Sequence, residues 1–266
     1  MQRLSSVVRD GALAIINVGS DFTVYKVHKE LLVEHSDYFK RTLRSLWRSD
    51  QDTVTRLEDV DSDTFDIFVD WLYTQKLPDN AIDWIPVDEQ LACDTEPYEE
   101  DVFMAGEASH RAKQLQQAKA YVLGNRLSSP QFKQAVYKIY LDELGGSDTL
   151  PCYHAVTYAF ANLPADDLLL QLMVDSHCHN FCKGFDGSAD AEDRKQLPRE
   201  FLVRVMLRYS DLVAKHDQEP LDAADYVLSG EKGGDAQARS TIGTDEGTEV
   251  YTGSDAYDDT DTGFGF

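Results

Sequence analysis

The order of the secondary-structure signals near the start of the chain constrains its fold most. Residues 12–18 (ALAIINV) form a mostly apolar run, which predicts a strand buried on both faces. Residues 19–21 (GSD) supply turn chemistry, and residues 22–27 (FTVYKV) are rich in β-branched and aromatic side chains. We therefore expect a β-hairpin over residues 12–27, followed directly by helices.

Two short helices are predicted immediately after the hairpin. Leu31 and Leu32 give residues 29–35 an apolar side, and Ser36 is a good N-cap for a second helix that begins with Asp37. Three apolar side chains then recur at helical spacing, namely Phe39, Leu43 and Leu46. The two helices form a corner, and the second helix presents a surface.

The next segment adds one strand and an amphipathic helix. Residues 53–57 (TVTRL) predict a short strand. Asp61 or Ser62 can cap a helix with apolar residues at i, i+3, i+4 and i+7, which are Phe65, Phe68, Val69 and Leu72. Pro78 ends this helix, because the residue before a proline disfavours helical backbone. The order is strand, strand, helix, helix, strand, helix.

The rest of the chain alternates predicted helices with polar segments. Residues 79–108 are acidic and contain no Lys or Arg, so we expect a mobile insertion loop. Helical patterns follow at residues 110–127, 130–144, 150–162, 167–181 and 198–214, with a polar connector at 183–196. From Ser229 onward Gly, Asp and Thr dominate, which predicts a disordered acidic tail.

Charge and cysteine content narrow the class of protein. The formal net charge of −23 argues against binding to nucleic acid or to anionic membranes, since both need clusters of Lys and Arg. No signal-peptide pattern and no run of about 18 apolar residues occurs, so we expect an intracellular protein of the cytoplasm or nucleus. The four scattered cysteines are interpreted as free thiols: Cys93, Cys152, Cys178 and Cys182.

Four stretches carry recognisable motifs. Residues 27–39 (VHKELLVEHSDYF) fit the pattern VHK..L...S.yF, and residues 63–74 (DTFDIFVDWLYT) fit TFe.fl.WLYT. Residues 120–127 (AYVLGNRL) fit the pattern lYvLAdkL, and residues 197–202 (LPREFL) fit the pattern LPkeFL. Together these motifs resemble the BTB/POZ family, in particular the stand-alone BTB proteins of filamentous fungi. The signature positions are His28, Leu32, Ser36, Phe39, Phe65, Trp71, Leu72 and Tyr73.

The resemblance implies an α+β fold, a small sheet flanked by helical hairpins, at residues 12–145. An all-α extension at 146–228 and the acidic tail at 229–266 follow it. Residues 1–11 are expected to be too short for the extra helix and strand of domain-swapped family members. The family serves protein–protein interaction: many members dimerise, and some bind a cullin scaffold and deliver substrates to a ubiquitin ligase.

The family's cullin-binding members use an apolar-x-Glu tripeptide after the second helix of the corner. Aligned backward from the strand at 53–57, that tripeptide is Trp47-Arg48-Ser49 here. The apolar position is kept, but the acid is replaced by Ser49 unless a register shift brings in Asp50. We predict a partner surface with Trp47 as its main contact, formed by Tyr38, Leu46, Trp47, Ser49 and Asp50. A cullin and a second copy of the chain both stay open as partners.

No group of residues predicts catalysis, a cofactor or a metal site. His28 has no nucleophile context such as G-x-S-x-G, so a structural role is favoured. His177, Cys178, His179 and Cys182 are zinc-type residues, but successive helical residues point about 100° apart and do not all face one ion. We therefore predict a non-enzymatic interaction module, either a ubiquitin-ligase adaptor or a self-associating scaffold, with an enzyme as the third alternative.

Overall fold

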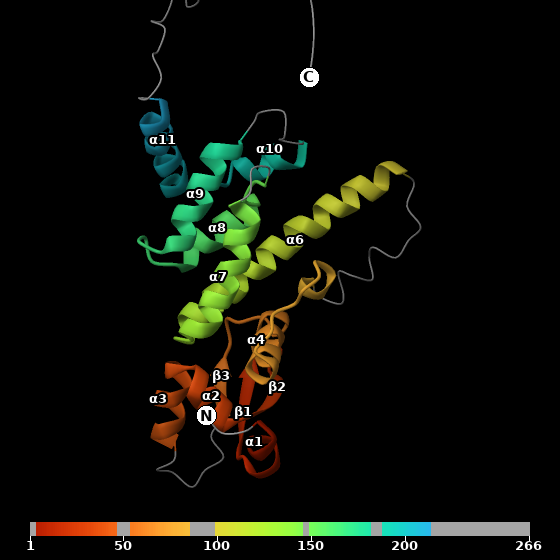
Figure 1. The fold of residues 1–266 in the computed structure, drawn as a ribbon, viewed down its shortest axis with the longest axis vertical. Coiled ribbons are helices and arrows are strands. Elements are labelled where there is room, and N and C mark those ends of the chain that lie inside the picture. Colours follow the sequence, from red (N-terminus) through yellow and green to blue (C-terminus); the bar gives the residue numbers. More distant parts are fainter. Residues whose placement is uncertain (1–3, 47–53, 86–98, 146–148, 182–187, 214–266) are drawn as a thin grey trace, which may run out of the picture. The chain divides into compact units, whose positions relative to one another are not determined.

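The predicted hairpin is present in the computed structural model of the chain. β1 (Leu13–Val18) and β2 (Thr23–His28) pair antiparallel, from Leu13 opposite His28 to Val18 opposite Thr23. Gly19 starts the connecting turn with a φ of +74°, a backbone region that suits glycine. The structure describes residues 4–46, 54–85, 99–145, 149–181 and 188–213, and their elements are labelled in Figure 1.

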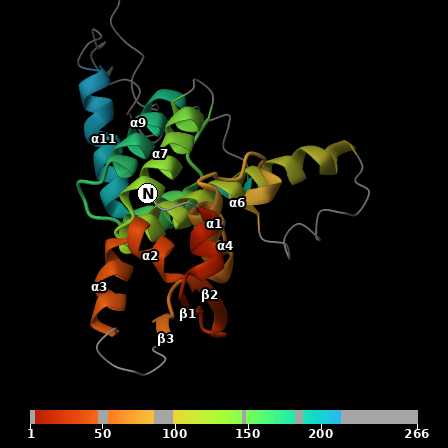
Figure 2. The same cartoon turned by 60° about the horizontal axis from the view of Figure 1, so that its bottom comes forward.

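A third strand completes the sheet. β3 (Val54–Leu57) lies parallel to β1, and the strand order is β2-β1-β3 (Figure 2). Along β1 the side chains of Ala14, Ile16 and Val18 are buried, whereas Leu13 is 47% exposed. The prediction that this strand is buried on both faces is therefore wrong. Only one face of the sheet is packed, and an apolar run alone does not distinguish one-sided from two-sided burial.

Four helices accompany the sheet. α1 (Leu4–Asp10) precedes β1, α2 (Lys29–His35) and α3 (Asp37–Leu46) form the corner after β2, and α4 (Ser62–Thr74) follows β3. Asp61 caps α4 as predicted, because its carboxylate accepts the Thr64 N–H at 2.8 Å. α4 ends before Pro78 is reached: Gln75 adopts the left-handed conformation, with a φ of 57°, and its N–H donates to the Trp71 carbonyl.

The predicted insertion loop at 79–108 is interrupted at both ends by helical structure. The 3-10 helix η1 (Ile82–Trp84) buries Trp84, whose ring N–H donates to the Pro78 carbonyl at 3.0 Å. α6 (Glu99–Arg126) begins well before the expected residue 110. The acids that open it suit a helix N-terminus, where negative charge is favourable, so acidic composition did not require a loop. Residues 86–98 lie outside the described part of the chain.

The later helices lie close to their predicted bounds. They are α7 (Pro130–Leu144), α8 (Tyr153–Asn162), α9 (Leu168–Asn180) and α11 (Arg199–Val213). α10 (Ser188–Arg194) lies where a polar connector was expected. Its sequence has no apolar stripe from which a helix could be predicted. The helix is held by polar contacts: Asp190 pairs with Arg111 of α6 at 3.0 Å, and Asp193 lies 3.4 Å from His154 Nδ1. The expected acidic tail at 229–266 falls outside the described residues.

One apolar core connects the sheet region with the later helices through α6. α6 contacts α4 and η1 on the sheet side and α7 and α8 on the other. The rings of Phe68 and Phe132 meet edge to face at 5.1 Å, which joins α4 directly to α7. The fold is therefore the predicted small sheet with flanking helices, followed by a further all-helical region. No helix in the described ranges is long and apolar enough to cross a membrane.

Candidate interaction surface

The corner between β2 and α3 is fixed first by a histidine and a tyrosine. His28 Nδ1 lies 2.6 Å from the Tyr73 hydroxyl oxygen, which also accepts the His28 backbone N–H at 3.3 Å. Because the hydroxyl oxygen is already an acceptor, its own proton is available to Nδ1. His28 therefore joins the end of β2 to α4, which is a structural role of the kind predicted for it.

Ser36 connects the same corner to the end of α6. Its hydroxyl accepts the Phe39 N–H at 3.2 Å, as expected of an N-cap, and donates to the Leu127 carbonyl at 2.6 Å. The backbone N–H groups of Asp37 and Tyr38 donate to the carbonyls of Ser128 and Leu127. The start of α3 is thus attached to the α6–α7 turn by several hydrogen bonds.

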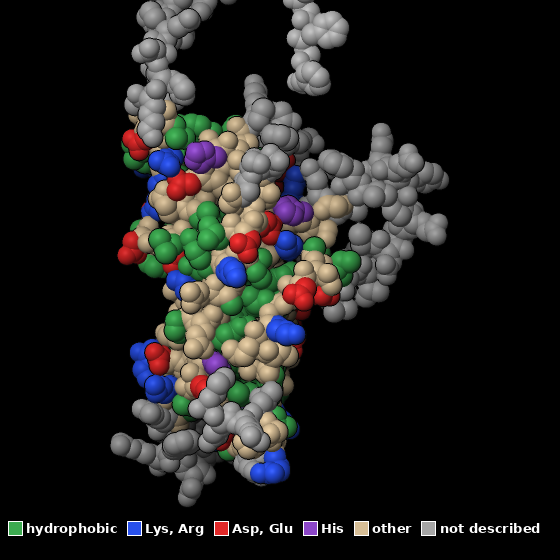
Figure 3. All heavy atoms as spheres, viewed as in Figure 1, with side chains coloured by type: hydrophobic (Ala, Val, Ile, Leu, Met, Phe, Trp, Pro, Cys, Tyr) green, Lys and Arg blue, Asp and Glu red, His purple; other side chains and the backbone are tan. Residues whose placement is uncertain are grey.

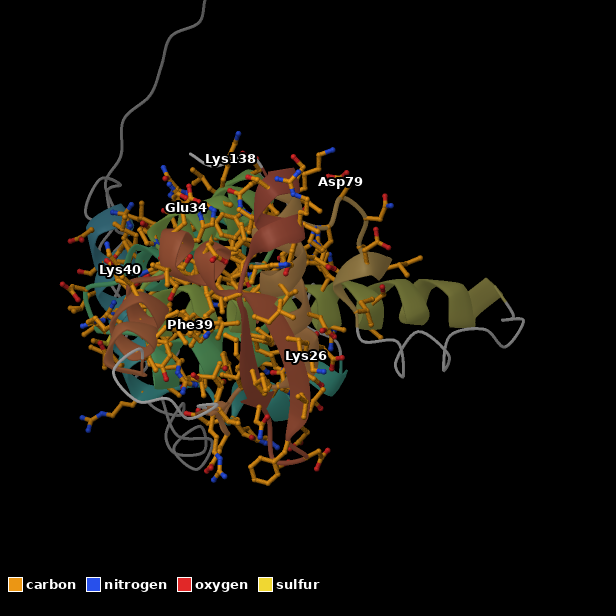
Figure 4. All side chains as sticks on the ribbon, turned by 90° about the horizontal axis from the view of Figure 1, so that it is seen from below. Lys26, Glu34, Phe39, Lys40, Asp79 and Lys138 are labelled. Atoms are coloured by element: carbon orange, nitrogen blue, oxygen red, sulfur yellow. The ribbon has the colours of Figure 1, made fainter. Side chains whose placement is uncertain are left out.

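These attachments give α3 an inner and an outer face. Phe39 and Leu43 are buried in the core, and Leu32 of α2 is fully buried beside them in the same cluster. Figure 4 shows Phe39 on the inner side of α3 and Lys40 at the outside of the molecule. Arg41 is exposed next to Lys40. The described outer face of α3 is therefore polar, and Lys40 on it pairs with Asp37 at 3.7 Å.

The structure describes only part of the predicted partner surface. Tyr38 is half-buried, with its ring 5.2 Å from that of Phe39, so it lies at the border between the two faces. Leu46 is the last residue of α3, and its side chain is outside the description. Trp47, Ser49 and Asp50 also fall outside the described residues. Their assignment to a partner surface stays a prediction.

The other signature positions are core residues. Phe65, Trp71 and Leu72 of α4 are buried, and Trp71 lies against Phe132 with ring centroids 5.2 Å apart. Tyr73 is half-buried and serves as the partner of His28. The signature therefore marks residues that build and hold the corner.

Charges on the surface are mixed in sign. Acidic and basic side chains are interspersed on the face shown in Figure 3. Asp59 pairs with Arg126, and Asp61 lies 3.5 Å from Lys119. The two acids before α4 thus form ion pairs with basic residues of α6. The hydrogen bond from Arg126 holds the pKa of Asp59 below its usual value. These contacts connect the sheet region to α6 without forming a patch of one charge.

A buried polar cluster joins α6, α7 and the start of α9, and the sequence does not predict it. The Asp167 carboxylate accepts the Tyr121 hydroxyl at 2.8 Å, the Lys133 ammonium at 2.6 Å and the Leu169 N–H at 3.0 Å. It therefore caps α9 while binding side chains of α6 and α7. Only the cap has a local sequence signal, because the other two partners are far away along the chain.

The zinc-type residues of α9 lie in a packed helix end. His177 stacks on Phe181 at 4.8 Å and meets Phe201 at 5.4 Å, and the Cys178 thiol lies 3.7 Å from the Val205 carbonyl. His179 is exposed, and Cys182 is outside the description. In the described ranges no three His, Cys, Asp or Glu residues form a group suited to a metal ion.

A cavity of about 220 Å³ lies between α6 and the start of α8. Its charged lining is already neutralised, since Arg111 pairs with Asp190 and Lys119 with Asp61. Burial raises the pKa of the Cys152 thiol that also lines it, so this cysteine stays protonated at neutral pH. Cys152 and Cys178 are both free thiols, as predicted for them.

The comparison with protein families decides the identity of the sheet region. Residues 14–104 match the family model described as the BTB/POZ domain. The chain contains a BTB/POZ domain. The match begins in β1 and ends within α6, and it covers the corner, the sheet and α4. A BTB/POZ domain supports a role in protein–protein interaction, and the predicted resemblance to the BTB/POZ family is confirmed for these residues. No curated protein matches the chain.

Proposed function

We propose that this BTB/POZ protein holds a partner protein on the outer face of α3 and on the segment that follows it, including Trp47. The observation that supports the proposal is the division of α3 into two faces. Phe39 and Leu43 are committed to the core, and Ser36 fixes the start of the helix. A rigid helix with its inner side anchored is a good platform for a partner, because little ordering is needed on binding.

The contribution of Trp47 is tested by substitution. Trp47→Ala should weaken partner binding about tenfold or more, as expected for an aromatic anchor, and leave the melting temperature nearly unchanged. Trp84→Ala is the control, because Trp84 is buried and its loss should cost about 3–5 kcal/mol of stability. A large fall in the melting temperature of Trp47→Ala would place Trp47 in the core and remove it from the surface.

The partner itself has two candidates. The apolar Trp47 supports a substrate adaptor that binds a cullin, whereas Ser49 in place of the family's acid supports a self-associating scaffold without a cullin. A pull-down with the N-terminal region of a cullin separates the two. If the chain is an adaptor, Ser49→Glu should strengthen the cullin interaction. If neither the natural chain nor this variant is retained, the scaffold is the better account.

The proposed role requires no catalysis or cofactor. Burial raises the pKa of the Cys152 thiol, which disfavours a thiolate nucleophile, and His28 is held by Tyr73. We also infer that the protein acts in the cytoplasm or nucleus, since free thiols suit a reducing compartment. Fluorescence microscopy of the tagged chain in its cells of origin tests the compartment; a secreted product would contradict it.

A further inference from the structure

α11 is apolar on two opposite faces. Its inner face is packed: Phe201 is fully buried against Phe160, with ring centroids 5.5 Å apart, and Val205 is buried beside Cys178. The outer face carries four more large apolar side chains. Leu202 is 46% exposed, Val203 40%, Met206 62% and Leu207 57%.

These four residues form one stripe, because positions i, i+1, i+4 and i+5 are neighbours on a helix. Among the side chains that the structure describes, each of the other helices has at most one that is large, apolar and exposed. A contiguous exposed apolar patch marks a contact surface. The outer stripe of α11 therefore has the properties of a contact surface.

The charges of α11 indicate what covers it. Arg204 pairs with Glu200, and Arg208 pairs with Asp175 at 2.7 Å, so these charges are satisfied within one copy. Arg199 and Asp211 are exposed near opposite ends of the helix, and neither has an ion-pair partner among the described residues. A stripe with a free base at one end and a free acid at the other complements itself when two copies run antiparallel.

We propose that the outer stripe of α11 binds the same stripe of a second copy, as an antiparallel helix pair about a two-fold axis. The centre of the stripe then lies between Arg204 and Val205, so Leu202 faces Leu207 of the second copy and Val203 faces Met206. Arg199 of each copy lies beside Asp211 of the other. Such an isologous contact needs a surface that matches itself, and this one does in shape and in charge.

The size of the stripe sets the strength of the contact. Stable interfaces bury about 800 Å² on each partner, which is more than four side chains on one helix provide. We therefore expect a dimer that dissociates in the micromolar range or above and depends on protein concentration. This dimer is separate from the partner surface on α3, so the failure of one proposal leaves the other standing.

The test measures the mass of the full chain by sedimentation velocity over about 1–300 µM, a range chosen to include weak micromolar association. We expect the mass to rise from monomer to dimer. Met206→Asp places a charge in the centre of the stripe and should raise the dissociation constant about a hundredfold. Leu141→Asp is the matched control, because Leu141 is a 44%-exposed apolar residue of α7, and it should dimerise like the natural chain.

A charge exchange tests the antiparallel arrangement. Arg199→Glu should weaken the dimer, and adding Asp211→Arg to it should restore the interaction. A chain that stays monomeric over the whole range overturns the proposal. A dimer that survives Met206→Asp also overturns it, because the contact would then lie elsewhere. Circular dichroism of each variant confirms that α11 and the rest of the helices are still formed.

Discussion

Asp167→Ala should destabilise the fold strongly for the removal of one polar side chain. The carboxylate caps α9, and such a cap contributes about 1 kcal/mol. It also accepts the buried Tyr121 hydroxyl, which costs about 1–3 kcal/mol when left without a partner. Lys133 would lose its partner too, but its side chain is 25% exposed and can be hydrated again. The total expected loss is about 3 kcal/mol of unfolding free energy.

Urea unfolding monitored by circular dichroism measures this loss. Asp142→Ala is the control, because Asp142 is an exposed acid of α7 and its removal changes the net charge equally. We expect the control to lie within about 0.5 kcal/mol of the natural chain. A loss below about 1 kcal/mol for Asp167→Ala would mean that the cluster is not a main connection between α6, α7 and α9. In a double-mutant cycle, Lys133→Met should cost less in the Asp167→Ala chain than in the natural one.

The same cluster predicts a dependence on pH. Burial by itself raises the pKa of Asp167, but hydrogen bonds from Lys133, the Leu169 N–H and Tyr121 outweigh it and leave this pKa below the usual value. A carboxyl with a lowered folded-state pKa stabilises the fold above its unfolded pKa, about 3.9, and loses that effect as pH falls through the folded pKa. The stability difference between the natural chain and Asp167→Asn should therefore shrink below about pH 4. A difference that is constant down to pH 2 would contradict the assignment.

Two further substitutions test single buried groups by thermal melting. Ser36→Ala should cost about 2 kcal/mol, because it removes the α3 cap and one of the two hydrogen bonds to the Leu127 carbonyl. Ser20→Ala in an exposed turn should have little effect. Gln117→Leu should stabilise the chain by about 1 kcal/mol, because both polar atoms of this fully buried side-chain amide lack hydrogen-bond partners. Gln134→Leu, at an exposed site of α7, is the control and should not stabilise the chain. A lower melting temperature for Gln117→Leu would show that a water molecule satisfies the amide.

The parts of the fold that the sequence predicts are those with local signals. The hairpin is encoded by two short apolar or β-branched runs around Gly19. The corner is encoded by Ser36, whose capping hydrogen bond to Phe39 spans three residues. Its second hydrogen bond, to the Leu127 carbonyl, joins residues 91 positions apart and has no sequence signature. The capping hydrogen bond of Ser36 is therefore predictable from the sequence, and its hydrogen bond to Leu127 is not.

The predictions that failed concern segments held by distant partners. α10 has no amphipathic pattern, and its Asp190 depends on Arg111 of α6. The early start of α6 is hidden by an acidic composition that is equally compatible with a loop and with the first turns of a helix. For the partner surface, the sequence distinguishes the core residues Phe39 and Leu43 from the outer face of α3, because α3 has one apolar side.

In α11 the hydrophobic pattern predicts the helix but not the side that faces the core. The run Phe201 to Leu207 (FLVRVML) is apolar at six of its seven positions, so its periodicity predicts a helix without indicating which side faces the core. Burial separates the two sides, since Phe201 and Val205 are covered while Met206 and Leu207 are open. An amphipathic helix such as α3 thus reveals its outer face in the sequence. In a run that is apolar at nearly every position, the sequence does not separate the packed side from the open side, and the structure is needed to tell them apart.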